Sequence, residues 1–387
     1  MSSAFPIFRM HNFRYLFIIF SCAVLCAIFV YHEWQKTVFL HETNAVLSWY
    51  SAPQVLAASG KRRVKTPERE AKGIYLTAYS AGSSKKLDQM IDLLNRTELN
   101  AVVIDIKDYS GKILYDSDVP LVNELQTEDN RLGDVGVLIQ KLHDHDIYVI
   151  ARQTVFQDPI LAAKKPEWAI ANKTGGLWRD NKGLAWVDPT KRAVWEYNMD
   201  IAKEAAMLGF DEINFDYVRF PTDGNLSLVA YENGEQSLHE VMRSFFAHID
   251  ETFKTVPVWT SIDVFGLVME HENGLPVIGQ RMGNATDYVD YISPMMYPSH
   301  YAAGHLGLAN PAAAPGVVIE NGMKKGAPIF LGTRAKVRPW IQAFHLGAVY
   351  DAEKIRAQID AVERHTDAGW LLWNAANRYG TDGLKLE

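Results

Sequence analysis

Apolar and polar positions alternate with a period of two in the segment GFDEINFDYVRFP, residues 209–221. Such alternation predicts a β-strand, which we place over Glu212–Phe220. A helical pattern precedes this segment and Pro221 ends it. Asp216 lies near the C-terminal end of the strand, where a buried charge is costly unless it is paired or used. In barrels of alternating strands and helices, that end of a strand carries the functional groups, so Asp216 is the first candidate.

Strand-like and helix-like patterns alternate from Gly73 onward. The predicted strands are Gly73–Tyr79, Ala101–Lys107, Ile147–Val155, Glu212–Phe220, Val258–Phe265, Tyr291–Tyr297, Arg338–Phe344 and Gly369–Asn374. The predicted helices include Lys85–Asn95, Val135–His145, Ala193–Leu208, Ser237–Thr252 and Ala352–Thr366. Eight such units in about 315 residues predict an α/β fold, the (β/α)8 TIM barrel. A doubly wound open sheet is the alternative, but no strand is followed by a glycine-rich phosphate loop.

An uncharged apolar run, Tyr15–Tyr31, lies near the N-terminus. Its length fits a short membrane span of roughly 17–25 residues, and the preceding Arg9 and Arg14 predict a cytoplasmic N-terminus. We expect a cytoplasmic segment at 1–14, a transmembrane helix at 15–31 that anchors the chain in the lipid bilayer, a linker at 32–71 and an extracytoplasmic barrel at 72–387. A cleaved signal peptide and a lipoprotein site at Cys22 are alternatives, but the bulky neighbouring residues suit neither.

The composition narrows the range of partners. The formal net charge is −7, which argues against nucleic acid because phosphate binding needs concentrated Lys and Arg. The ten tryptophans suit a cleft for sugar rings, although they also suit an ordinary core. Both cysteines, Cys22 and Cys26, lie in the apolar run, so the rest of the chain has no disulfide framework and no cysteine metal site.

Polar side chains interrupt the apolar strands near their C-terminal ends, at similar depth. They are Asp105, Lys107 and Asp108 on the second strand, Arg152 and Gln153 on the third, Asp216 and Arg219 on the fourth, Asp263 on the fifth, Tyr297 on the sixth, Gln342 on the seventh, and Trp373 and Asn374 on the eighth. Because these strand ends meet at one face of a barrel, we expect the side chains to form one constellation.

Glycoside hydrolysis is the chemistry that best fits this constellation, because it needs two carboxyl groups. Asp216 and Asp263, on adjacent predicted strands, form the best catalytic pair. We expect Arg219 to keep Asp216 ionised, and we expect the apolar neighbours of Asp263 to raise its pKa. For the remaining side chains we predict substrate-binding roles: Asp105, Lys107, Arg152, Arg219, Tyr297, Gln342, Trp373 and Asn374.

Structural roles compete with these assignments. Asp216 would also fit a structural partner of Arg219 or Arg152, and Asp263 would fit a helix cap or an ion pair. Asp105 with Lys107 fits a supporting ion pair as well as a catalytic one. Tyr297 and Trp373 fit a sugar-stacking platform and a core aromatic cluster equally well.

The loops and histidines add two further expectations. The long segments 158–189, 269–283 and 302–315 follow predicted strands and are expected to form the walls of the cleft. The run His143–Asp146 lies before a strand, hence at the opposite end of the barrel from the expected pocket. The chain has no HExxH and no GxSxG motif, which disfavours zinc and serine hydrolases. We expect no metal and no cofactor.

Several motifs resemble a known family, the glycoside hydrolases catalogued as domain of unknown function 4015. They occur in the family's order over about residues 72–382: KGIYLTAYSAG, NAVVIDIKDYSGKILY, IYVIARQTVFQDP, PEWA, WVDPTKRAVWEYN, GFDEINFDYVRFPTDG, YISPMMYPSHY, VRPWIQAF and WLLWNAANRY. The resemblance implies an α-amylase-like TIM barrel and a glycosidase role. It places Asp216 at the acidic position of the family's fourth strand and Asp263 in its fifth-strand motif. Unlike α-amylase-type sequences, the fifth strand ends in Asp, and no His-Asp pair follows the seventh.

The sequence therefore predicts a membrane-anchored enzyme that hydrolyses an envelope or secreted polysaccharide by carboxylate acid/base catalysis. A non-catalytic glycan-binding barrel that serves cell-envelope assembly is the main alternative. A phosphodiesterase or deacetylase is a third possibility, and it would require a bound metal.

Overall fold

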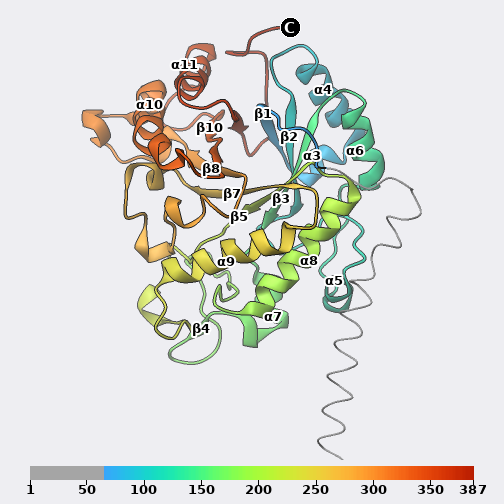
Figure 1. The fold of residues 1–387 in the computed structure, drawn as a ribbon, viewed down its shortest axis with the longest axis vertical. Coiled ribbons are helices and arrows are strands. Elements are labelled where there is room, and N and C mark those ends of the chain that lie inside the picture. Colours follow the sequence, from blue (N-terminus) through green and yellow to red (C-terminus); the bar gives the residue numbers. More distant parts are fainter. Residues whose placement is uncertain (1–64) are drawn as a thin grey trace, which may run out of the picture. The chain divides into compact units, whose positions relative to one another are not determined.

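The computed structural model describes residues 65–387 (Figure 1). The predicted cytoplasmic segment, the predicted anchor at 15–31 and the linker up to residue 64 lie outside these residues. Within residues 65–387, no helix combines the length and the apolar character that a membrane span requires. The last part of the predicted linker packs on the barrel, because Trp259 donates to the Thr66 carbonyl at 2.9 Å and Lys65 pairs with Asp290 at 3.0 Å.

Eight parallel strands close into a barrel, which confirms the predicted strand architecture. They are β1 (Ala71–Leu76), β2 (Ala101–Lys107), β3 (Tyr148–Thr154), β5 (Glu212–Asp216), β7 (Trp259–Phe265), β8 (Tyr291–Met296), β10 (Trp340–Gln342) and β11 (Gly369–Trp373). The ring closes because β10 pairs with both β8 and β11, and β11 pairs with β1. The two-residue strand β9 (Lys336–Val337) pairs with β8, and β4 (Ala171–Asn172) and β6 (Val229–Ala230) form a separate two-stranded sheet.

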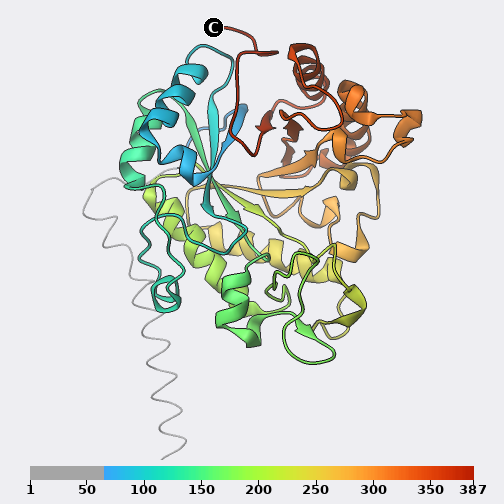
Figure 2. The ribbon, with the colours of Figure 1, turned by 180° about the vertical axis from the view of Figure 1, so that it is seen from behind.

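Helices surround the strands when the molecule is seen from the front and from behind (Figures 1 and 2). They are α3 (Ala78–Ala81), α4 (Ser84–Leu94), α5 (Pro120–Leu125), α6 (Val135–His143), α7 (Pro159–Lys164), α8 (Arg192–Leu208), α9 (Leu238–Phe253), α10 (Pro315–Gly326) and α11 (Ala352–Glu363). The five predicted helices correspond to α4, α6, α8, α9 and α11. Side chains cap the start of several of them, as Ser237 and Glu240 do in the capping box of α9.

One connection within residues 65–387 departs from the predicted strand–helix repeat. Between β7 and β8 the chain forms three short 3₁₀ helices, Gly266–Glu270, Pro276–Ile278 and Met282–Asn284, and no α-helix. Gly274 has a φ of +67°, and a Cβ there would lie 2.2 Å from the carbonyl oxygen of Gln280. The tight turn therefore requires glycine, which is incompatible with a continuous helix.

The N-terminal end of the barrel is closed by a buried ion pair. Arg338 pairs with Glu212, and both side chains are fully buried. Tyr148 donates its hydroxyl to Glu212 at 3.1 Å, and the Arg338 guanidinium lies 4.1 Å from the ring centre of Tyr291. Buried charges require such partners, so the charged groups at this end have a structural role.

Two local irregularities decide which side chains reach the other end. The register between β2 and β3 shifts at Asp105 and Lys107, so Asp105 pairs with Arg152 whereas Lys107 pairs with Gln153. In a regular strand, Asp105 and Lys107 would point to the same side. Because of the bulge at this shift, the Lys107 side chain points to the opposite side. At the end of β5, Tyr217 has a φ of +54°, which ends the strand before the predicted limit at Phe220.

Candidate active site

The Arg152 guanidinium connects three carboxylates inside the barrel. Its Nη1 donates to Asp105 Oδ1 at 2.6 Å, its Nη2 donates to Asp216 Oδ2, and its Nε lies 3.8 Å from Asp263 Oδ2. These residues come from four neighbouring strands, β3, β2, β5 and β7. The predicted pair, Asp216 and Asp263, thus lies in one group with Asp105 and Arg152.

Asp263 is almost completely enclosed, with 2% of its surface exposed. Asn214 Nδ2 and Trp340 Nε1 both donate to its Oδ1, each at 2.9 Å. Burial, reinforced by the negative charge of Asp216, raises the pKa of Asp263 to about 8. This is the direction that its apolar neighbours in the sequence predict, and it leaves the carboxyl group largely protonated at neutral pH.

Asp105 is buried as well, and it shares its charge between two partners. Tyr75 donates its hydroxyl to Asp105 Oδ2 at 2.5 Å, opposite the Arg152 contact on Oδ1. Burial raises the pKa of Asp105 even though Arg152 opposes the shift. For Arg152 itself burial would lower the pKa, but the charges of Asp216 and Asp105 outweigh it and hold that pKa well above its ordinary value.

Asp216 is fixed by its own backbone as well as by Arg152. Its Oδ1 accepts a hydrogen bond from the backbone N–H of Tyr217 at 2.5 Å. Tyr217 adopts the left-handed conformation, which is strained for an aromatic residue and is typical of functional sites. The turn directly after β5 therefore orients the Asp216 carboxylate at the mouth of the barrel.

Aromatic side chains enclose this group of charges. Tyr75 and Trp373 stack with ring centres 4.0 Å apart and an interplanar angle of 19°. The Arg152 guanidinium lies 5.2 Å from the Trp373 ring. Burial raises the pKa of Tyr297, and the nearby charges of Asp263 and Asp216 add to the shift. Trp373 as a residue is half-buried, unlike the fully enclosed Trp340 next to it.

Lys107 does not join the group, contrary to the sequence-based interpretation. Because of the bulge in β2, its ammonium lies behind the barrel wall, where it pairs with Asp158 at 2.8 Å and donates to Asn198 on α8 at 3.0 Å. Both members of the ion pair are fully buried. This placement fits a structural role rather than the predicted contact with substrate.

Arg219 lies beyond β5 and forms no direct ion pair with Asp216, although the two charges interact at longer range. Arg152 makes the direct contact instead. The Arg219 guanidinium lies among three aromatic rings, those of Trp186, Tyr217 and Phe265. The expectation that Arg219 keeps Asp216 ionised assumed that the strand continues through Arg219. The left-handed turn at Tyr217 ends the strand at Asp216, so the regular alternation of sides does not extend to Arg219.

Gln342 and Asn374 lie at the predicted strand ends, but their amides are engaged in the loops. Gln342 accepts from the Ser299 N–H at 3.1 Å and donates to the Phe344 carbonyl at 3.0 Å. Asn374 donates to the carbonyls of Ala343 and Arg378 at 2.8 and 2.9 Å. Their contacts hold the rim together, which leaves these two amides few free groups for a substrate.

Three residues of the site were missed in the sequence: Tyr75, Asn214 and Trp340. Asn214 had a usable signal, because it precedes Asp216 by two positions and therefore shares its side of the strand. Tyr75 lies between Ile74 and Leu76, and Trp340 lies between Pro339 and Ile341, so nothing in the pattern separates them from core aromatics. Their polar atoms become informative only when the barrel closes.

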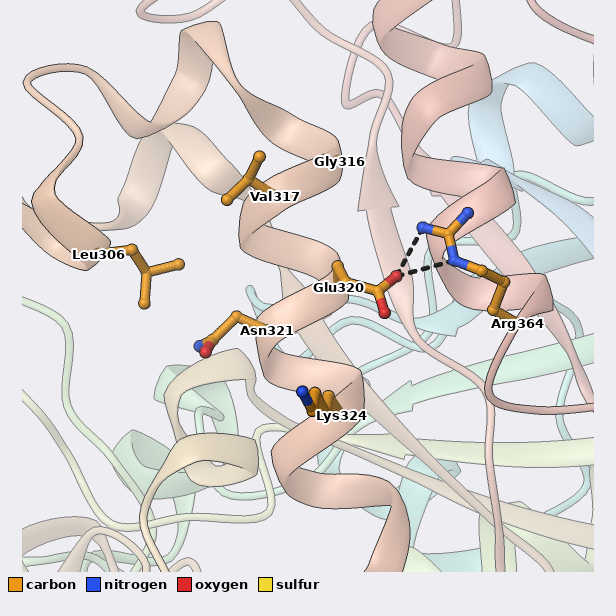
Figure 3. A pocket seen from close by; sticks show the side chains of 7 residues that line it. All are labelled: Leu306, Gly316, Val317, Glu320, Asn321, Lys324 and Arg364. Atoms are coloured by element: carbon orange, nitrogen blue, oxygen red, sulfur yellow. Dashed lines mark hydrogen bonds and ion pairs between the residues drawn. The ribbon is translucent and has the colours of Figure 1, made fainter.

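A separate groove of about 490 Å³ lies at the surface beside α10 (Figure 3). Its lining residues are Leu306, Gly316, Val317, Glu320, Asn321, Lys324 and Arg364, none of which is a predicted site residue. Arg364, the residue directly after α11, donates a hydrogen bond to Glu320 of α10 in this groove. Over residues 65–387, no group of three or more His, Cys, Asp or Glu side chains is arranged to hold a metal ion.

The family described as "Putative glycosyl hydrolase domain", domain of unknown function 4015, matches residues 73–379. A hypothetical protein from Ruminiclostridium thermocellum ATCC 27405 is 41% identical over 48% of this chain and 96% of its own, with a TM-score of 0.46. The PgaB (BpsB) glycoside hydrolase domain from Bordetella bronchiseptica is 13% identical, covering 79% of this chain and 94% of its own, with a TM-score of 0.56. The alpha-galactosidase TtGalA from Thermus thermophilus, in complex with stachyose, is 13% identical over 83% of this chain and 64% of its own, with a TM-score of 0.51. No protein of curated function matches the sequence.

The likenesses to the Bordetella and Thermus proteins concern the fold, which is a barrel that glycoside hydrolases also use. The family match covers nearly the whole described barrel and confirms the resemblance seen in the sequence motifs. The chain therefore belongs to the family of the "Putative glycosyl hydrolase domain", domain of unknown function 4015.

Proposed function

We propose that this protein hydrolyses glycosidic bonds of an envelope or secreted polysaccharide, with Asp263 as the general acid and Asp216 as the second carboxylate. The observation that carries the proposal is the placement of Asp263, which is almost fully buried, in one group with Asp216 and the Arg152 that holds it. This burial raises the pKa of Asp263 to about 8. In glycosidases, two carboxyl groups in different environments divide the work: one donates a proton and the other acts as the base or nucleophile.

The hydrogen bonds specify where the acidic proton sits. Asn214 and Trp340 both donate to Oδ1 of Asp263, so this oxygen acts as an acceptor. In the neutral form the proton therefore occupies Oδ2, the oxygen on the side of Arg152. When Asp263 transfers this proton to a glycosidic oxygen, Arg152 and the two donors on Oδ1 stabilise the resulting carboxylate.

Asp216 supplies the negative charge that the reaction needs opposite the acid. Its two oxygens accept hydrogen bonds from Arg152 and from the Tyr217 N–H, which hold the carboxylate in one orientation. In this role it acts on the anomeric carbon or on a water molecule, according to the stereochemistry of the reaction. The half-buried Trp373 offers an aromatic face against which a sugar ring would stack.

The cellular location is part of the proposal. The apolar run Tyr15–Tyr31 and the basic residues before it support a single-pass anchor with the barrel outside the cytoplasm. Fusion of a reporter enzyme that is active only outside the cytoplasm to the C-terminus tests this topology. A reporter active only in the cytoplasm would contradict it.

A non-catalytic glycan-binding protein is the second candidate, and one observation favours it. Asp105 and Asp216 are each only 4% exposed, and both already contact Arg152. Such a network also suits a purely structural core of buried charges.

Hydrolysis and binding separate the two candidates. The full-length protein and its Asp263→Asn and Asp216→Asn variants are incubated with a panel of soluble polysaccharides and with isolated envelope polysaccharide, and reducing ends are counted. Enzymatic function predicts release by the wild type and a loss of about 100-fold or more in each variant, with binding retained. Binding without release in all three proteins would favour the glycan-binding candidate.

A further inference from the structure

Arg219 is a buried cation without an anionic partner at the mouth of the proposed active site. Only 8% of its surface is exposed. Its single hydrogen bond within residues 65–387 runs from Nη1 to the carbonyl of the adjacent Phe220, at 3.0 Å. A guanidinium has five N–H donors, so most of its hydrogen-bonding capacity is unused.

Aromatic rings take the place of a carboxylate around Arg219. The guanidinium carbon lies 4.9 Å from the ring of Trp186, 5.1 Å from that of Tyr217 and 5.0 Å from that of Phe265. Ring faces attract a cation, but they do not replace in-plane acceptors for its N–H groups. Burial accordingly lowers the pKa of Arg219.

The acidic residues in the neighbourhood are occupied elsewhere or too distant to pair with Arg219. Asp216 contacts Arg152 and the Tyr217 N–H. Asp180 accepts from two backbone N–H groups of its own turn and from Trp186 Nε1 at 3.1 Å. Asp223 acts on Arg219 only through its longer-range charge.

The segment that carries Arg219 is held in place on both sides. Gln280 Nε2 donates to the Val218 carbonyl at 3.3 Å, and the Phe220 N–H donates to the Ile278 carbonyl at 3.0 Å. The loop after β7 thus fixes the loop after β5. A binding group held in this way needs little further ordering when a ligand arrives.

We propose that Arg219 binds a singly charged oxyanion on the substrate, so that the enzyme acts on an acidic glycan. The inference rests on the proposed function, because it concerns a sugar bound next to Asp216. The guanidinium fork matches the two oxygens of a carboxylate, as in a uronic acid, and a sulfate ester offers the same oxygen geometry. A group with two negative charges is disfavoured because the charge of Asp216 already acts on Arg219 and would repel the ligand.

Equilibrium binding to matched probes tests this inference with the full-length protein. Oligogalacturonate and hyaluronan oligosaccharides are each compared with their methyl esters, which keep the sugar and the linkage and remove the charge. Carrageenan oligosaccharides and their desulfated counterparts form the sulfate arm. We expect at least one charged probe to bind about tenfold more tightly than its neutral partner, as a charge-assisted hydrogen bond provides.

Two substitutions assign the preference to Arg219. Arg219→Met is expected to remove it, and Arg219→Lys, which keeps the charge without the fork, is expected to retain part of it. Arg243→Met is the matched control, because Arg243 also lies over an aromatic ring, that of Tyr288 at 5.6 Å. A preference in the carboxylate arm or in the sulfate arm identifies the oxyanion.

Two results would overturn the inference: equal binding of charged and neutral probes in every arm, or a preference that persists in Arg219→Met. Release of reducing ends is followed in parallel. Charge-selective binding without hydrolysis would refute the proposed function and leave the binding of an oxyanion by Arg219 standing. Hydrolysis without charge selectivity would support the proposed function and overturn the inference about Arg219.

Discussion

The indole N–H of Trp340 lies 2.9 Å from Oδ1 of Asp263, and it approaches from β10 across the interior of the barrel. This contact stabilises the ionised form of Asp263 and so works against the burial that raises the pKa to about 8. Trp340 thereby limits how strongly the proposed acid holds its proton.

The substitution Trp340→Phe should raise the pKa of Asp263 further, because it removes a donor to the carboxylate. We expect the alkaline limb of the pH profile of kcat/KM to move upward by about one pH unit, the effect of one hydrogen bond. Trp370→Phe is the control, since Trp370 is also a buried indole donor, at 3.3 Å from Glu363 on the helical side of β11. A limb that stays in place in Trp340→Phe, or moves equally in both variants, would contradict the assignment.

Asp263 should make the folded protein less stable as the pH rises. Its pKa is about 8 in the folded state and near 4 when unfolded, so the folded state binds the extra proton between these values. Stability from this group is therefore present at pH 4 and is lost progressively up to pH 8. We expect Asp263→Asn, which stays neutral, to have an unfolding midpoint temperature close to that of the wild type at pH 5 and above it at pH 9. A difference that does not change with pH would show that Asp263 is ionised throughout.

Removal of Arg152 should destabilise the protein strongly. Arg152→Met leaves Asp105, Asp216 and Asp263 buried without their shared cation, and breaking such a buried pair typically costs about 3–5 kcal/mol. Urea unfolding measures this change. Arg96→Met is the control, because Arg96 forms an exposed pair with Asp92 that is expected to contribute less than about 1 kcal/mol. Equal, small effects in both variants would mean that Arg152 does not organise the site.

Lys107 should act on stability rather than on the substrate. Lys107→Met leaves Asp158 buried without its partner, and we expect a loss of about 3–5 kcal/mol in the free energy of unfolding. Under conditions where the variant remains folded, its KM should equal that of the wild type. A raised KM with unchanged stability would instead support the substrate-binding role that the sequence predicts.

The sequence was a good guide to the barrel and a partial guide to the site. Period-2 and helical patterns report burial on each element, so they located the eight strands and brought Asp105, Arg152, Asp216 and Asp263 to one end. They could not reveal the bulge in β2, because it depends on the register with β3. Nor could they reveal the left-handed Tyr217, which moves Arg219 out of the strand. Both errors arise where the backbone departs from the regular geometry that such patterns assume.

Partners from distant strands posed a different problem. Tyr75 donates to Asp105 from β1, and Trp340 donates to Asp263 from β10. In the sequence, both residues are flanked by apolar residues, as an aromatic residue of the core would be. Only the closed barrel brings these donors to the carboxylates. Sequence patterns therefore identified the charged groups of the site more readily than the neutral ones that orient them.

The role of Asp263 as the general acid is tested most directly by titrating its carboxyl group with carbon-13 NMR of protein labelled at the aspartate side chains. Asp263→Asn assigns the signal. We expect a midpoint near pH 8 in the wild type and a lower midpoint in Asp216→Asn, because the charge of Asp216 contributes to the raised pKa. A midpoint near pH 4, the ordinary value for aspartate, would show that Asp263 is ionised at neutral pH and is not the general acid.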